Sequence, residues 1–148
     1  IVSSVNVFVR GEKEVEEKAF ETHRISREFA NDVGISRRKM CLLFQDMAES
    51  ADEIVGHNVD FDVKMLMSEM IKEGGTGNIF QKKAIYCTMK EATNVCKIPH
   101  PKRPGQFKWP SLAEAYCTLV DPRGFENAHD AEADVLACHE VFRVLRAA

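Results

Sequence analysis

Short apolar, strand-like runs alternate along this chain with longer segments of helical character, and this alternation constrains the fold more than any other feature. Two such runs are Glu53–Gly56 and Lys83–Tyr86, and a helical segment follows each of them. An alternation of strands and helices predicts an α/β domain, in which a mixed sheet is flanked by helices. At 148 residues, the chain is long enough for a single domain with one core.

Capping residues, periodicity and glycine or proline stops locate the helices more closely. Ser36 and Thr88 are of the type that caps helix N-termini, and Gly74-Gly75 is of the type that ends a helix. The helices predicted in this way cover residues 36–50, 60–74, 88–95, 110–119 and about 130–145. The first ten residues alternate in character and predict a further strand. Because no methionine precedes it and domains rarely begin inside a sheet, we expect residues 1–148 to be an N-terminally incomplete domain.

Composition bears on the class of protein and on its partners. A net charge of −3 gives no general attraction to nucleic acid, so binding of DNA or RNA requires a local basic patch. The sequence shows neither a signal-peptide pattern nor an apolar run of the roughly 18 residues that a membrane span needs. The five cysteines are widely spaced and form no CxxC pair, which indicates reduced thiols. We therefore expect a cytoplasmic protein with no membrane partner.

Two short acidic motifs carry the candidate chemistry. His57–Asp62 (HNVDFD) follows the first strand-like run, and His129–Asp134 (HDAEAD) opens the last helix. An aspartate directly after a strand lies where α/β sheets place their ligand sites. Asp60 and Asp62 are about 200° apart on a helix, so the two cannot share one face. Carboxylates suit Mg²⁺ or Mn²⁺, and two aspartates with a histidine suit metal-dependent cleavage of a phosphodiester.

Each of these residues also has a simpler interpretation. Asp62 near a helix start is more often a cap than a metal ligand, and His129 is more often a capping or surface histidine. His57-Asn58 by itself fits a turn. The order and spacing of the two motifs together favour the functional interpretation.

The two motifs resemble those of the DEDDh family of 3′-5′ exonucleases, which includes the proofreading epsilon subunit of DNA polymerase III and ribonuclease T. The family's second motif, HNxxFD, and its third, HxAxxD, are matched in full by the two segments above. His23–Ser26 is similar to the family's HGIT turn, with arginine in the glycine place, and Ile85–Met89 is similar to the strand and turn that follow the second motif. The resemblance covers nearly the whole chain and implies a ribonuclease H-like fold.

The resemblance also implies roles for individual residues. Asp62 and Asp134 would be two of the four acidic ligands of two Mg²⁺ or Mn²⁺ ions, and His129 would be the general base that deprotonates water. The substrate would be a single-stranded or frayed 3′ end of DNA or RNA, and the product a nucleoside 5′-monophosphate. A second copy of the chain or a polymerase would be the protein partner. The residues expected to hold the terminal nucleotide are His23, Asn58 and Phe61, the last of which also fits a core position.

The family's first motif is the one that the chain lacks. This DxE on the first strand supplies the other two metal ligands, whereas the DxE of this chain, Asp130–Glu132, lies inside the third motif. We expect the first strand and its DxE upstream of Ile1, and little nuclease activity from residues 1–148 alone. The alternative is a catalytically dead homologue that binds nucleic acid or positions a polymerase. A phosphohydrolase of the HD type is suggested by His129-Asp130. It is disfavoured because that class resembles an all-helical bundle, whereas this chain has strand-like runs.

A basic, proline-rich loop is expected between residues 97 and 108. It interleaves positive charge with aromatic side chains: His100, Lys102, Arg103, Phe107, Lys108 and Trp109. This mixture suits the steering and stacking of single-stranded nucleic acid. The simpler interpretation is a solvated loop in which Trp109 anchors the helix that follows.

Overall fold

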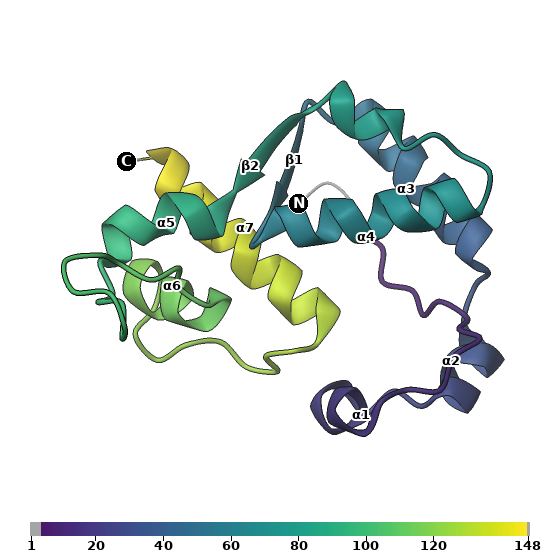
Figure 1. Cartoon of the computed structure of the whole chain (residues 1–148), viewed down its shortest axis with the longest axis horizontal. Helices are drawn as coiled ribbons and strands as arrows, with labels where there is room; N and C mark the ends of the chain where they lie inside the picture. Colours follow the sequence, from purple (N-terminus) through teal and green to yellow (C-terminus); the bar gives the residue numbers. More distant parts are fainter. Residues whose placement is uncertain (1–3, 148) are drawn as a thin grey trace.

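The computed structural model describes residues 4–147, which form a mixed α/β fold with a small parallel sheet (Figure 1). Strand β1 (Glu53–Gly56) pairs with β2 (Ala84–Cys87), and Gly56 lies opposite Cys87. Parallel strands need a long connection, and helix α4 (Val59–Lys72) with the 3-10 helix η1 (Asn78–Gln81) provides it. The predicted α/β class is therefore confirmed.

The helices predicted from residue 36 onward lie close to their expected places, whereas the helices over residues 17–23 and 27–33 were not predicted. Ser36 caps α3, because its hydroxyl accepts a hydrogen bond from the N–H of Lys39. None of the helices formed by residues 4–147 combines the length and the apolar composition that crossing a bilayer requires. Besides α4, the helices are α1 (Glu17–His23), α2 (Arg27–Val33), α3 (Arg37–Ser50), α5 (Thr88–Cys96), α6 (Leu112–Leu119) and α7 (Ala131–Ala147).

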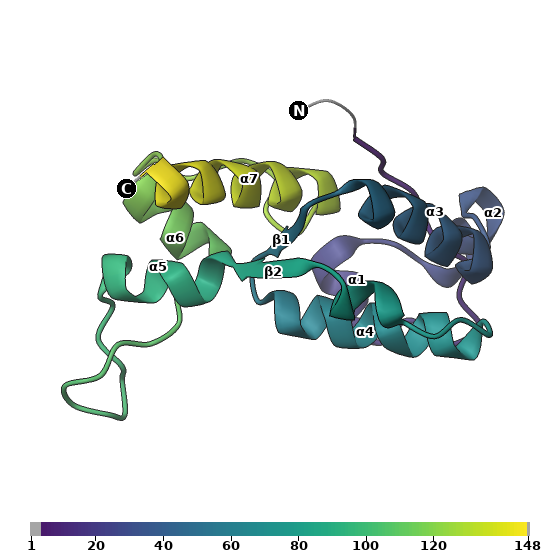
Figure 2. The ribbon, with the colours of Figure 1, turned by 90° about the horizontal axis from the view of Figure 1, so that it is seen from above.

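Helices α4 and α7 lie on opposite sides of the strands (Figure 2), and both contact β1. Buried side chains form separate clusters rather than one continuous core. One cluster joins α3, α4 and η1 through Cys41, Met70 and Phe80. Another joins α5, α6 and α7, whose fully buried Ala92, Ala115 and Val141 allow close packing of the three helices. The short strands thus lie between α4 and α7, and both helices contribute residues to the lining of the candidate site.

The strand predicted over the first ten residues is not formed by residues 4–8. Val9 alone makes a ladder contact, a parallel bridge to Ile35, and residues 1–3 lie outside the described part. Val5 is 50% exposed, so the alternation of valines does not correspond to a buried face. The prediction is wrong for this segment because Val5 and Val7 stay exposed, although the ring of Phe8 contacts that of Phe29.

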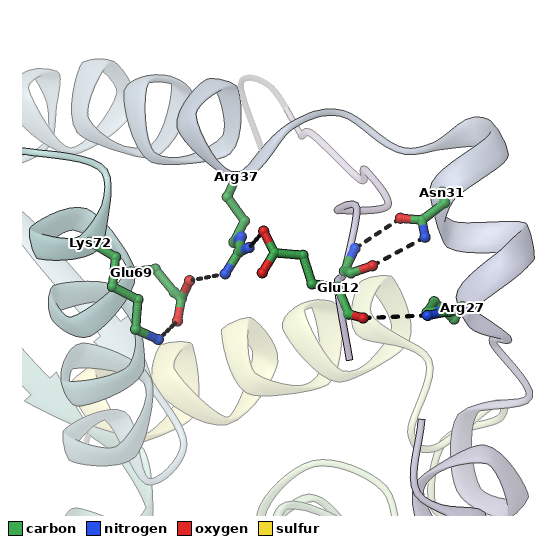
Figure 3. Close-up of polar contacts among 7 residues, drawn as sticks. Glu12, Arg27, Asn31, Arg37, Glu69 and Lys72 are labelled. Atoms are coloured by element: carbon green, nitrogen blue, oxygen red, sulfur yellow. Dashed lines mark hydrogen bonds and ion pairs between the residues drawn. The ribbon is translucent and has the colours of Figure 1, made fainter. Parts of the chain in front are cut away.

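Polar contacts attach the N-terminal segment to the rest of the molecule (Figure 3). The carboxylate of Glu12 lies 2.7 Å from the guanidinium of Arg37, which also pairs with Glu69 of α4. Gly11 and the side chain of Asn31 exchange two hydrogen bonds of 3.0 and 3.1 Å. Helices α1 and α2 contain no buried residue, so these contacts matter for their position.

Candidate functional site

A cavity of about 630 Å³ opens beside the C-terminal end of β1, between α4 and α7. Its walls are mainly apolar. On both helices the lining residues recur with helical spacing, so each helix presents one face to the cavity. The lining residues of α4 are Val59, Asp62, Val63 and Leu66, and those of α7 are Asp134, Val135, Cys138, His139 and Phe142.

Asp62 and Asp134 are the acidic residues of this lining. They lie far apart in the sequence, and the packing of α4 against the strands and α7 brings them to one cavity. Burial raises the pKa of Asp62 above its ordinary value. Asp60, two residues earlier, turns to another side and pairs with Lys90, whose hydrogen bond lowers the pKa of Asp60. Only one of the two neighbouring aspartates therefore faces the cavity, as helical geometry predicts.

His129 lies next to Asp134 through its backbone. It occupies an exposed turn directly before α7, in the left-handed region with φ of 76°, and its N–H donates to Oδ1 of Asp134 at 3.3 Å. Its imidazole is not part of the cavity lining. Asp130 caps α7, because its Oδ1 accepts from the N–H groups of Glu132 and Ala133. The start of α7 thus brings the third motif to the edge of the cavity.

His57 has a role that the sequence did not indicate. Its half-buried ring lies 3.0 Å from the Thr88 hydroxyl through Nδ1 and 3.0 Å from the carbonyl of Pro110 through Nε2. A carbonyl only accepts, so Nε2 carries the hydrogen, and Nδ1 of the neutral ring is an acceptor that shares the single hydroxyl proton of Thr88 with the Gly56 carbonyl. Burial lowers the pKa of His57. The ring joins the end of β1 to α5 and to the segment before α6, and so supports the cavity wall.

Thr88 does not cap α5, contrary to the prediction. It is the first residue of the helix, is fully buried, and lies with its hydroxyl oxygen 3.2 Å from the carbonyl oxygen of Gly56. The hydroxyl is engaged by β1 and His57 rather than by the N–H groups of its own helix. Tertiary contacts therefore override the local capping preference.

The three residues expected to hold a terminal nucleotide do not line the cavity. His23 ends α1, and its Nδ1 accepts from the N–H of Ile25 at 3.0 Å. Asn58 has left-handed backbone, with φ of 67°, in the turn between β1 and α4. Phe61 is 59% exposed in the first turn of α4, so its interpretation as a core residue is wrong.

Sequence reasoning missed the contribution of α7 beyond Asp134. Cys138 follows Asp134 by four positions and shares its face, so helical spacing could have identified it, whereas His139 is about 140° from Asp134 around the helix and only the structure shows that it lines the cavity. Cys138 is buried, and this burial raises the pKa of its thiol. His139 is half-buried, with Nδ1 3.4 Å from a carboxylate oxygen of Glu140. These side chains narrow the cavity beside the Asp134 carboxylate.

The ligand atoms that the cavity offers are of the type that a hard divalent cation prefers, but they are too few for a two-ion centre. Asp62 and Asp134 offer the carboxylate oxygens that Mg²⁺ and Mn²⁺ prefer. Among residues 4–147, no group of three or more histidine, cysteine, aspartate or glutamate side chains is arranged to hold a metal ion. The described residues thus offer two carboxylates, which is fewer than a two-ion centre needs.

No protein-family model and no curated protein sequence matches this chain. The relation to DEDDh exonucleases therefore stays a resemblance carried by the two motifs. The function has to be argued from the residues at the cavity.

Proposed function

We propose that this chain contributes Asp62, Asp134 and His129 to the catalytic cleft of a metal-dependent 3′-5′ exonuclease with a ribonuclease H-like fold. The observation that carries the proposal is that Asp62 and Asp134 line one cavity at the end of β1. The hydrogen bond from the His129 N–H to Asp134 supports it further, because it keeps the histidine beside one of these carboxylates. The exposed imidazole is open to solvent, as a base that takes a proton from water must be.

The proposal requires acidic ligands beyond the two in the cavity. Mg²⁺ or Mn²⁺ ions would supply Lewis-acid activation of the phosphodiester and of the attacking water. The resemblance to DEDDh exonucleases assigns the additional carboxylates to a DxE motif on the first strand of the family's sheet. In the complete site, a 3′-terminal nucleotide of single-stranded DNA or RNA would leave as a nucleoside 5′-monophosphate.

A second candidate function is a non-catalytic module that binds nucleic acid or a polymerase. The incomplete donor set among residues 4–147 favours it. The coding sequence upstream of Ile1 discriminates the two functions. An Asp-x-Glu on an apolar strand there supports the exonuclease, whereas its absence or substitution supports the binding module.

Cleavage of 5′-labelled single-stranded DNA and RNA oligonucleotides in Mg²⁺ and Mn²⁺ tests the proposal. Residues 1–148 should show at most slow shortening from the 3′ end, and the form that includes the upstream residues should be far faster. Asp62→Asn and Asp134→Asn should abolish shortening, and His129→Gln should slow it about 10²- to 10⁴-fold, the usual contribution of a general base.

Asp60→Asn is the matched control, because Asp60 is in the same helical turn but pairs with Lys90 outside the cavity. It should leave shortening unchanged. Equal activity of Asp62→Asn and Asp60→Asn in the longer form would contradict the exonuclease. Vigorous Mg²⁺-dependent release of mononucleotides by residues 1–148 would show that no DxE is needed.

A further inference from the structure

The segment that connects α5 to α6 is an ordered hairpin rather than an irregular loop. Lys108 N–H donates to the Ile98 carbonyl and His100 N–H donates to the Gln106 carbonyl, both at 2.9 Å. Pro99 and Phe107 face each other as an antiparallel bridge between these two pairs. Figure 2 shows the segment extending away from α5 at one end of the molecule. We call residues 97–109 the basic ribbon.

In an ordinary amphipathic hairpin the aromatic side chains are on the buried face, whereas in the basic ribbon they are on the exposed face. Side chains alternate between the faces of such a ribbon. Ile98, His100 and Lys108 are half-buried, whereas the opposite face carries Phe107, which is 43% exposed, and Trp109, which is 63% exposed. The segment is largely solvent-exposed, as the simpler interpretation holds, but Trp109 is not buried against α6, so its expected role as an anchor of that helix is wrong. Two large aromatic side chains on a solvent face provide a surface for a ligand.

The charge of the basic ribbon is of one sign. No acidic residue occurs from Lys97 to Ala113, although the whole chain has a net charge of −3. Lys108 is neutralised by Glu114 of α6. In the described part of the chain, Lys97, Lys102 and Arg103 take part in no ion pair. Their charge is left for an anionic ligand.

The basic ribbon is connected to the rim of the cavity. Trp109 directly precedes Pro110, whose carbonyl accepts the hydrogen bond from Nε2 of His57. His57 and Leu112, two residues beyond Pro110, both line the cavity. Trp109 is therefore one residue from the segment that supports the cavity wall through His57.

We propose that the basic ribbon binds single-stranded nucleic acid, with bases stacked on Phe107 and Trp109 and phosphates on Lys97, Lys102 and Arg103. Aromatic faces beside unpaired cations are the combination that holds unpaired bases without reading their sequence. The choice of nucleic acid over another polyanion rests on the proposed function. Binding itself requires neither metal nor cleavage.

Trp109 provides a direct readout, because it is the only tryptophan of the chain. In EDTA, a 20-nucleotide oligo-dT or oligo-U should quench its fluorescence, and fluorescence anisotropy of the labelled oligonucleotide should give the affinity. Trp109→Ala and Phe107→Ala should each weaken binding about tenfold, the usual effect of removing one stacking side chain. Lys102→Gln with Arg103→Gln should lower the slope of log affinity against log salt by about 1.4, since each phosphate contact on a single strand contributes about 0.7.

The matched control replaces Arg38 and Lys39 of α3 by glutamine, because both are exposed and make no ion pair among the described residues. This variant should keep the affinity and the salt slope of the wild type. Equal losses in the control and in the ribbon variants would overturn the proposal. Quenching of Trp109 by polyglutamate as strong as by oligo-dT would also overturn it, in favour of an acidic protein partner.

The same measurements separate this inference from the exonuclease proposal. If binding depends on the ribbon residues but cleavage does not depend on Asp62, the proposal for the basic ribbon stands and the exonuclease proposal is contradicted. If cleavage depends on Asp62 but the ribbon variants bind like the wild type, the exonuclease proposal stands and the proposal for the basic ribbon is contradicted.

Discussion

Asp60 and Asp62 are two positions apart on α4, and both are exposed, but different groups surround the two carboxylates. Asp60 is exposed and paired with Lys90, so its ionised form is favoured. Asp62 faces an apolar cavity whose walls disfavour its charge. A carboxylate in such surroundings costs stability and is typical of a position that serves a ligand.

We expect Asp62→Asn to unfold at an equal or higher temperature than the wild type at pH 7. The raised pKa means that the folded state binds the Asp62 proton more tightly than the unfolded state, so ionisation of Asp62 opposes folding at neutral pH. This penalty fades as the pH falls toward the ordinary value of 3.8, and the advantage of the variant should fade with it. Thermal unfolding followed by circular dichroism at pH 7 and pH 4 measures both. A lower unfolding temperature at pH 7 would contradict the expectation.

His57→Ala should lower the free energy of unfolding by about 1–3 kcal/mol, because it leaves the Pro110 carbonyl without its donor and removes one of the two acceptors near the Thr88 hydroxyl. The lowered pKa of His57 means that the unfolded state binds its proton more readily. The neutral His57 ring therefore contributes to stability fully above pH 6.5, and this contribution is lost as the pH falls from 6.5 through the lowered pKa. Urea unfolding at pH 7 and pH 5 should show a smaller acid loss in the variant. An identical loss would show that His57 does not titrate in this window.

At the scale of elements, local signals placed the ends of helices well where polar caps are exposed. Helix α6 begins with a capping box, in which the Ser111 hydroxyl accepts from the Glu114 N–H and the Glu114 carboxylate accepts from the Ser111 N–H. The same carboxylate pairs with Lys108, whose hydrogen bond lowers the pKa of Glu114. The start of α6 therefore also holds the end of the basic ribbon.

Ser111→Ala should destabilise the protein by about 1 kcal/mol, the usual cost of losing an N-cap side chain. Ser111→Asp is the matched variant, because its carboxylate also accepts the helix N–H groups. It should retain most of the wild-type stability in urea unfolding. A loss of equal size in both variants would assign the effect to the hydroxyl itself rather than to capping.

At the scale of the whole molecule, the N-terminal segment and the body differ in how they are held. The body buries apolar side chains between its helices, whereas α1 and α2 bury none. Arg37 links the two parts, since it pairs with Glu12 on one side and Glu69 on the other (Figure 3). The Arg37–Glu12 pair, whose carboxylate is exposed, holds the segment weakly and is screened by salt.

Limited proteolysis should therefore cut the segment 11–34 first and leave a fragment that begins near α3. Arg37→Ala should speed this cleavage, because it removes both ion pairs, and added salt should speed cleavage of the wild type. Arg38→Ala is the control on the same helical turn and should cleave at the wild-type rate. Mass spectrometry of the fragments over time gives the sites and rates. Equal rates for the two variants would show that Arg37 does not hold the segment.

The sequence by itself determined the α/β class and most helix ends. It also determined that Asp60 and Asp62 lie on different faces of their helix. These features follow from periodicity and from capping groups a few residues apart, which are local properties of the chain. Predictions from these local patterns were wrong for the strand at Val5 and for the cap at Thr88. The strand needed an apolar surface from elsewhere in the chain, and the Thr88 hydroxyl found a distant partner in His57.

Only the tertiary structure decided the features on which function depends. It brought Asp62 and Asp134 to one cavity, buried the His57 ring against Pro110 and left Trp109 on a solvent face. Each outcome arises from contacts between segments far apart along the chain. Their free energy comes from packing and burial, which the local pattern of residues does not specify.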